Sequence, residues 1–437
     1  MKRPNLNSRS LRYPLLTAYQ ENFYRLHKDL QEAFDSNTDE HWINKYLDWW
    51  EGYFRPTSFD SHTLTGEKKS DIVNLIGFAK GELGLGEDIR LTSKALDLVS
   101  IKNSIFSIDY PVPSRNTNLE LMNKISLTLP GRVSIFNLPP TEIYRLIYSH
   151  GLEVFSQTYN IAYAPWELDA WAPELAFCFD FIDEVWGISK YTTECFRKSL
   201  KCPVYHMPLS IDVPDVSDVN IFEKYSIPKN KFAFLLMFDL NSSIHRKNPY
   251  AGYEAFLSAF PSAEDVILVV KTMGEPGDVK EKMFFERLSK DPRVFIIRDT
   301  LAKCEVNALI AQTDCYVSLH RAEGFGRIMA EAMLLGTSVI ATNYSGNLDF
   351  MNDSNSYLVD YNLIKIDPSE YHYVYDNYWA DPIVSSASRH MREIFCNRDA
   401  SRRKSVAAVD TIEKCFSNRA NGERMVNRLI TTHELLG

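Results

Sequence analysis

Long apolar runs are missing from this 437-residue chain. No stretch approaches the roughly 18 apolar residues of a membrane-spanning helix. Polar residues follow Met1-Lys2-Arg3, where a secretory signal would place its apolar core. We therefore expect a protein that is made and kept in the cytoplasm, and peripheral contact with the inner face of the membrane stays open.

Cysteine is scarce, and its spacing suits neither a disulfide framework nor a metal site. The seven cysteines are odd in number and widely spaced, without a CxxC pair or a neighbouring His at metal-ligand spacing. We expect reduced, buried thiols. The cysteines are Cys178, Cys195, Cys202, Cys304, Cys315, Cys396 and Cys415.

An excess of basic residues is also missing. The chain has 48 Lys and Arg against 57 Asp and Glu, a formal charge of −9, which argues against wholesale binding of nucleic acid. Hydrophobic residues make up 45% and charged residues 24%, so disorder is excluded. A chain of this length predicts two or three domains.

Residues 1–65 predict a helical, aromatic-rich appendage and a linker. Residues 11–54 carry apolar side chains at helical spacing, and Pro56 to Lys69 is rich in Ser, Thr and Gly. The aromatic side chains either pack onto the main body or form a surface for a partner enzyme, a long acceptor or the membrane. They include Trp42, Tyr46, Trp49, Trp50, Tyr53 and Phe54.

Two series of short apolar runs then alternate with amphipathic segments. Such alternation predicts parallel sheets covered by helices on both faces, so the fold class is α/β with two Rossmann-like doubly wound domains facing each other across a cleft. We expect one domain at 66–215, a second at 216–400, and bracing helices at 401–437. Expected strands are 72–78, 104–106, 133–136, 159–163, 184–186 and 204–206, then 232–238, 266–270, 294–297, 315–318 and 338–341.

The most informative segment runs from His320 to Met333. It follows an apolar strand and enters a helix, so Gly324 to Gly326 form a turn whose free N–H groups suit a phosphate or a hydroxyl-rich ligand. Glu323 precedes the turn and Glu331 follows eight residues later, and a carboxylate accepts from paired sugar hydroxyls. By spacing alone, Glu323 could equally be a capping residue and Glu331 a solvated surface acid.

This Glu-x7-Glu segment resembles the donor-site signature of retaining nucleotide-sugar glycosyltransferases of family 4 (glycosyl transferases group 1), which have the GT-B fold. The resemblance extends over about residues 70 to 395 and is closest to bacterial O-antigen and polysaccharide mannosyltransferases. The other stretches that carry it are Gly81–Glu87, Trp166–Leu168, Phe181–Trp186, Arg246–Pro249, Thr342–Asn347 and Trp379–Pro382.

The resemblance implies roles for individual residues of the second domain. Glu323 would bind hydroxyls of the transferred sugar and Glu331 the ribose, while the amides of Gly324, Phe325 and Gly326 would contact sugar or diphosphate. Lys247 matches the family's cation for the donor phosphates. Many members place an Arg five residues earlier, where this chain has Ser242, so Arg246 is the candidate substitute. Lys271, after a buried strand, is a third candidate cation. No Asp-x-Asp occurs, so we expect no metal.

Candidates in the first domain rest on weaker patterns. Gly84 and Gly86 lie in a G-x-x-G-x-G loop that suits either approach to the donor or tight packing. Glu167 follows a strand and could orient an acceptor hydroxyl, with Trp166 stacked on a sugar; the alternatives are a surface ion pair and core packing. Asn137 is a similar acceptor candidate. For His320 a packed, hydrogen-bonded imidazole is the first interpretation.

The predicted function is a metal-independent, retaining hexosyltransferase. It would move a hexose, with mannose from GDP-mannose as first choice, to a glycan or lipid-linked glycan such as an O-antigen. No cofactor beyond the nucleotide sugar is expected, and no nucleic acid. The alternatives are another GT-B enzyme, namely a phosphorylase or nucleotide-sugar epimerase, and a non-catalytic glycan-binding or scaffold subunit.

Overall fold

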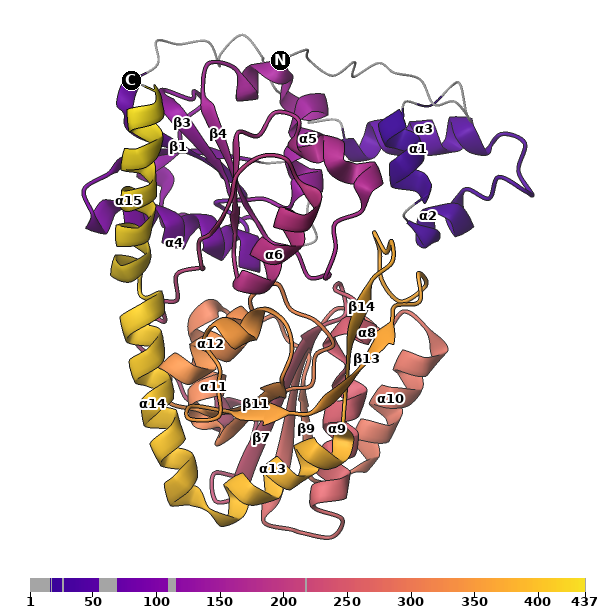
Figure 1. Ribbon diagram of the computed structural model, residues 1–437. Helices are drawn as coiled ribbons and strands as arrows, with labels where there is room; N and C mark the ends of the chain where they lie inside the picture. The colour runs from indigo at the N-terminus through magenta and orange to yellow at the C-terminus, as the bar shows by residue number, and fades with distance from the viewer. Residues whose placement is uncertain are drawn as a thin grey trace. The chain divides into compact units, whose positions relative to one another are not determined.

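The computed structural model describes residues 16, 18–25, 27–54, 69–108, 115–216 and 218–436. The predicted linker falls almost wholly outside these residues. The chain forms two compact units, each described here by itself (Figure 1). The first unit comprises residues 1–209, 366–377 and 421–437, and the second comprises 210–365 and 378–420. Both units are therefore built from segments that are distant in sequence.

The first unit is built on a parallel sheet with the strand order β2-β1-β3-β4-β5-β6. All six strands lie where the apolar runs predict them, because strands covered on both faces need near-continuous apolar sequence. Helices α4 (Gly84–Leu98), α5 (Pro140–His150) and α6 (Lys190–Ser199) connect them. The strands are β1 (Lys69–Gly77), β2 (Lys102–Ser107), β3 (Gly131–Phe136), β4 (Tyr159–Ala164), β5 (Glu184–Gly187) and β6 (Val204–His206).

The aromatic N-terminal segment forms three short helices, α1 (Ala18–Arg25), α2 (Lys28–Ala33) and α3 (Trp42–Phe54). Between α2 and α3 the carboxylates of Asp35 and Asp39 accept backbone N–H groups two residues ahead, which favours turns over a continuous helix. Phe23 packs edge-on against Trp50, at 5.3 Å between ring centroids, and against Tyr373, at 6.2 Å. The predicted helices are thus interrupted, and part of their aromatic surface packs within the first unit.

The second unit has the strand order β12-β11-β10-β7-β8-β9, again all parallel. The predicted five strands are present, and β12 was missed because its apolar run is only three residues long. Figure 1 shows α11 and α12 on one face of this sheet and α9 and α13 on the other. The strands are β7 (Phe232–Asp239), β8 (Val266–Met273), β9 (Val294–Ile297), β10 (Cys315–Ser318), β11 (Ser338–Thr342) and β12 (Tyr357–Val359).

The helices of the second unit follow the strands in the expected alternation. The core between the sheet and helices α9, α10 and α13 is made of buried Phe, Leu and Val side chains such as Phe234, Leu268 and Val270. The helices are α7 (Ile221–Lys224), α8 (Ile244–Lys247), α9 (Pro249–Ala259), α10 (Val279–Lys290), α11 (Lys303–Gln312), α12 (Arg327–Leu334), α13 (Val384–Cys396) and α14 (Arg398–Phe416).

Two further elements complete the fold. The antiparallel pair β13 (Tyr361–Lys365) and β14 (Tyr378–Pro382) belongs to the second unit, and its tip, residues 366–377, belongs to the first. Helix α15 (Asn418–Leu436) lies mostly in the first unit, where Arg428 Nε donates to Glu184 Oε1 at 2.8 Å. The predicted terminal helices are therefore present but divided between the units.

Two expectations from composition can be compared with the fold. Every cysteine is free, as predicted, but the prediction of burial is wrong for Cys396 and Cys415, which are exposed on helices α13 and α14. Within the described ranges, none of the helices is both long and apolar enough to cross a membrane.

Candidate donor site

Three loops of the second unit converge at the carboxyl ends of its strands. Helix α8, after β7, carries Arg246 and Lys247; Glu323 follows β10; and Ser345 and Gly346 follow β11. In a parallel sheet the carboxyl ends of all strands lie along the same side of the sheet, so loops that are distant in sequence meet there. Glu323 N–H donates to Ser345 Oγ at 2.9 Å, and Gly346 N–H donates to the Glu323 carbonyl at 2.9 Å.

Glu323 is the centre of a buried ion cluster. Lys247 Nζ lies 2.5 Å from Glu323 Oε1 and Arg246 Nη1 lies 3.1 Å from the same oxygen. The Glu323 side chain is 13% exposed and that of Arg246 6%. Burial opposes ionisation, but the charges of Lys247 and Arg246 outweigh it and lower the pKa of Glu323 to about 2. Glu323 is therefore a carboxylate at neutral pH.

The two cations of this cluster are held differently. Arg246 also donates to the Ala322 carbonyl and to Ser242 Oγ, each at 3.0 Å. Ser242, the residue that stands in place of the family's Arg, is thus a partner of Arg246. The Lys247 side chain is 27% exposed and has the greater access to solvent. The basic dipeptide thus lies beside Glu323, and Arg246 is the more firmly anchored of its two cations.

The turn after Glu323 depends on close backbone packing. Gly326 precedes α12 with φ of +95°, a conformation that favours glycine. A Cβ on Gly346 would lie 2.1 Å from the Gly324 carbonyl oxygen, so the loops after β10 and β11 approach too closely for a side chain. The Phe325 ring is buried against Phe350 at 5.1 Å, which leaves only its backbone for a ligand.

Glu331 lies one helical turn inside α12 and is completely buried. The interpretation of Glu331 as a solvated surface acid is therefore wrong. Its Oε1 lies 2.5 Å from Lys303 Nζ, while Oε2 has no hydrogen-bond partner among the described residues. Sequence reasoning missed Lys303 because it lies 28 residues away, at the start of a different helix, α11.

Lys271 and His320 each have hydrogen-bond partners within the second unit. Lys271 Nζ donates to the Thr272 carbonyl at 2.9 Å, and burial lowers the pKa of Lys271. His320 is fully buried, with Nε2 3.1 Å from Asn347 Oδ1 and Nδ1 3.3 Å from Ser318 Oγ, so a neutral ring can donate from Nε2 and accept at Nδ1. Burial lowers the His320 pKa, so the ring is neutral at pH 7. This agrees with a packed, hydrogen-bonded imidazole.

The glycine-rich loop of the first unit is held by its own side chains. Arg90 Nη1 donates to the carbonyls of Ala79 at 2.8 Å and Gly81 at 2.9 Å, and Nη2 bonds Glu87 at 2.9 Å. A Cβ on Gly86 would lie 2.0 Å from the Gly81 carbonyl oxygen, whereas a Cβ on Gly84 would meet nothing within 4 Å. Gly86 is therefore required by packing and Gly84 is not.

The three acceptor candidates differ in accessibility. Trp166 is 4% exposed, donates from Nε1 to the Ala170 carbonyl at 3.2 Å and packs edge-on against Trp171. Asn137 is 2% exposed, and its Oδ1 accepts from Thr92. The position of Trp166 favours the packing alternative, and Asn137 is too buried to lie on an open surface. Glu167 is half-buried, and its Oε2 accepts from the Tyr371 hydroxyl at 3.3 Å.

Comparison with known proteins adds a family to this geometry. Residues 229–365 match the family described as glycosyl transferases group 1. This match lies within the second unit, and residues 229–365 are called the group 1 domain below. No curated protein matches the chain. The group 1 domain contains both carboxylates, both residues of the basic dipeptide, Lys271 and Lys303.

Solved structures extend the likeness of fold to most of the chain. Sucrose-phosphate synthase from Thermosynechococcus elongatus is 13% identical, with a TM-score of 0.59, and the match covers 84% of this chain and 100% of that one. A glycosyltransferase from Rickettsia africae is 13% identical, with a TM-score of 0.57, and the match covers 83% of this chain and 98% of that one. Anabaena HepE, in complex with UDP and glucose, is 13% identical, with a TM-score of 0.56, and the match covers 82% of this chain and 99% of that one. These structural likenesses, at TM-scores above 0.5 over most of the chain, show the GT-B fold, as the sequence predicts.

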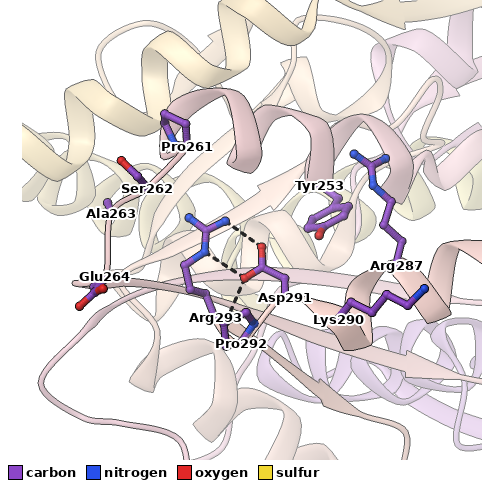
Figure 2. Close-up of a pocket in the computed structure, with 10 residues that line it drawn as sticks. All are labelled: Tyr253, Pro261, Ser262, Ala263, Glu264, Arg287, Lys290, Asp291, Pro292 and Arg293. Atoms are coloured by element: carbon purple, nitrogen blue, oxygen red, sulfur yellow. Dashed lines mark hydrogen bonds and ion pairs between the residues drawn. The ribbon is translucent and has the colours of Figure 1, made fainter.

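A hollow of about 490 Å³ lies elsewhere on the group 1 domain, where the residues before β8 and β9 meet (Figure 2). Its most buried cation, Arg293, is already bound to Asp291, with Nη2 2.7 Å from Oδ2 and Nε 2.9 Å from Oδ1. The hollow is at the amino ends of the strands, opposite the ion cluster, so it is not part of the candidate donor site.

Proposed function

We propose that this protein is a glycosyltransferase that moves a hexose from a nucleotide diphosphate sugar to a growing glycan, with retention of configuration and without a metal ion. The observation that carries the proposal is the convergence of Lys247, Arg246 and Glu323 at one strand edge of the group 1 domain. Glu331, with one carboxylate oxygen unpartnered among the described residues, lies on the helix that follows.

The residues divide the chemistry of bond cleavage between them. Breaking the bond from sugar to diphosphate develops negative charge on the leaving phosphate, which Lys247 and the N–H groups at the start of α12 would stabilise. Arg246, fixed by Ala322 and Ser242, would hold Glu323 and the turn in place. Glu323 would accept hydroxyls of the transferred sugar.

Retention is proposed without a protein nucleophile. The leaving phosphate itself would take the acceptor proton on the same face of the sugar, and domain closure would exclude water to prevent hydrolysis. His320 is buried, and its Nε2 lies within hydrogen-bond distance of the Tyr344 carbonyl and Asn347 Oδ1, so the ring is assigned to holding the loop after β11 and not to the reaction. In the first unit, Glu167 is the proposed acceptor-binding residue because it alone of the three candidates is half-exposed.

The donor and acceptor identities are proposals from sequence resemblance. We keep GDP-mannose as the first donor and an O-antigen or other surface polysaccharide as the first acceptor. UDP and glucose occupy the similarly folded Anabaena protein, so UDP-glucose is the second donor. Peripheral membrane contact through the N-terminal helices would suit a lipid-linked acceptor.

The test is a nucleotide screen followed by turnover. Thermal unfolding is measured with GDP, UDP, ADP and dTDP, and a nucleotide that binds the folded chain raises the melting temperature. The matching nucleotide sugar is then supplied with and without a glycan acceptor. We expect acceptor-dependent release of the nucleoside diphosphate, reduced about 10²- to 10³-fold by Glu323→Gln. Glu254→Gln, at an exposed ion pair with Arg287, is the matched control.

Each alternative gives a different result. An epimerase turns over nucleotide sugar without an acceptor, and a phosphorylase requires inorganic phosphate. A scaffold subunit binds glycan but releases no nucleotide, and Glu323→Gln leaves its glycan affinity unchanged. If none of the four nucleotides stabilises the protein, the proposed donor site is wrong.

A further inference from the structure

We propose that Lys303 is a positioning residue that orients Glu331 toward the ribose and so sets the preference for ribonucleotides over deoxyribonucleotides. The inference rests on the proposed function, because it assigns a ribose to Glu331. It adds a residue that neither the Glu-x7-Glu pattern nor the basic dipeptide contains. Lys303 begins α11, whereas Glu331 lies on α12.

The first step is the unequal environment of the two Glu331 oxygens. The side chain is fully buried, Oε1 lies 2.5 Å from Lys303 Nζ, and Oε2 is buried with no partner in the described part of the chain. A buried carboxylate oxygen without a hydrogen-bond donor is costly. A ribose hydroxyl is a donor of the kind that is missing.

The second step is the unfavourable place of Lys303. It is the first residue of α11, where the helix dipole disfavours a positive charge. The backbone there is fixed, because Glu305 Oε2 accepts the Ala302 N–H at 2.9 Å and Glu305 Oε1 accepts from Lys224 at 2.7 Å. The ion pair with Glu331 compensates this unfavourable position of the Lys303 charge. The Lys303 side chain is 37% exposed and contacts the buried carboxylate from the solvent side.

The third step is what the pair does to the carboxylate. With Oε1 bound to Lys303, rotation of the Glu331 carboxylate is restricted and Oε2 is the oxygen left for a ligand. Without Lys303, both oxygens would compete for any donor within the protein. The ion pair therefore orients the acceptor oxygen before the nucleotide arrives, and a preorganised acceptor improves discrimination between a hydroxyl and a hydrogen.

The experiment compares nucleoside diphosphates that differ in single hydroxyls. The nucleotide that binds best in the screen is titrated calorimetrically, beside its 2′-deoxy and 3′-deoxy forms, into wild type, Lys303→Met, Lys303→Arg and Lys290→Met. Lys290 is the matched control because it is exposed and lines the hollow at the opposite strand edge (Figure 2).

We expect wild type to bind at least one deoxy form about 10- to 100-fold more weakly, the effect of losing one hydrogen bond to a charged group. Lys303→Met should weaken binding of the ribonucleotide about tenfold. It should also reduce, several-fold, the ratio of the affinity for the ribonucleotide to that for the deoxy form, called the ribo-to-deoxy ratio. Lys303→Arg should retain most of the ratio, and Lys290→Met should match wild type.

A double-mutant cycle separates positioning from direct contact. In a Glu331→Gln background, Lys303→Met should leave the ribo-to-deoxy ratio unchanged, because its effect acts through Glu331. A lysine that binds phosphate directly would lower affinity equally in both backgrounds and would overturn the proposal. If Lys303→Met does not fold, Lys303→Gln gives the same comparison.

The failures are distinguishable. If wild type binds no nucleoside diphosphate, the proposed function fails. If wild type binds and discriminates, but the Lys303 variants keep the full ribo-to-deoxy ratio, the role of Lys303 is refuted and the proposed function stands.

Discussion

The two glycine-rich turns of this protein both follow a buried strand and both contain an ion pair, yet the pairs are built differently. In the first unit Arg90 and Glu87 are three residues apart in one helix, and Arg90 also binds the carbonyls of its own loop. In the second unit Lys247 and Glu323 are 76 residues apart and come from the ends of two strands. A local pair fixes a loop, whereas a pair assembled from two loops can be reorganised by a ligand.

Removing one cation from each turn should have the largest effects and should distinguish the two turns. Lys247→Met should reduce kcat/KM for the nucleotide sugar about 10²- to 10³-fold with the fold retained, because it removes charge from the leaving phosphate. Arg90→Met should destabilise the protein by about 2–4 kcal/mol, since buried carbonyls and Glu87 lose their donor. Steady-state kinetics and urea unfolding measure the two effects.

The outcomes are expected to separate cleanly. If Arg90→Met were stable and inactive while Lys247→Met were active, the assignment of binding to the second turn and structure to the first would be reversed.

Glycine substitutions test the same contrast at the backbone. Gly86→Ala places a Cβ 2.0 Å from the Gly81 carbonyl oxygen and should destabilise the protein by at least about 2 kcal/mol, as overpacking does. Gly84→Ala meets nothing within 4 Å, lies in the first turn of α4, and should be neutral or stabilise by up to about 1 kcal/mol. Urea unfolding of both variants checks the pair, and equal effects would show that the loop is not held by Gly86.

Much of this architecture could be predicted from apolar runs, because each buried parallel strand, such as Phe232–Asp239, needs continuous apolar sequence. The antiparallel pair β13 and β14 was missed because exposed polar residues such as Asn362 and Lys365 interrupt the apolar pattern. In the candidate site, Glu323 and Lys247 were predicted from resemblance. Lys303 could not be, because its contact with Glu331 arises only when α11 and α12 pack together.

The pH dependence of stability provides a smaller test of the second turn. Because the Glu323 pKa is lowered to about 2, the ion cluster stabilises the folded state above the ordinary carboxyl pKa near 4.5 and loses this contribution as the pH falls toward 2. The difference in unfolding free energy between wild type and Glu323→Gln should therefore shrink over that window, by at most about 3 kcal/mol. Urea unfolding at pH 7, 4.5 and 3 measures it.

A constant difference across these pH values would mean that Glu323 is stabilised by its hydrogen bonds and packing rather than by its charge. The charges of Lys247 and Arg246 would then not account for the stability of the second turn, although the contacts between the three side chains would remain.

The smallest expected effect concerns the first unit. It tests whether two side chains that meet there from distant segments of the chain form an acceptor-binding site. Glu167 and Tyr371 are 204 residues apart, and the tip between β13 and β14 brings the Tyr371 hydroxyl to the Glu167 carboxylate. If this pair binds the acceptor, Tyr371→Phe should raise the KM for the acceptor about two- to fivefold and leave the affinity for the donor unchanged. The effect is small because the hydrogen bond from the Tyr371 hydroxyl to the Glu167 carboxylate is long. Kinetics with acceptor and donor varied separately decide this. A change in stability alone, with both KM values constant, would make Glu167 a structural partner of the tip and would restrict the rule to the second unit.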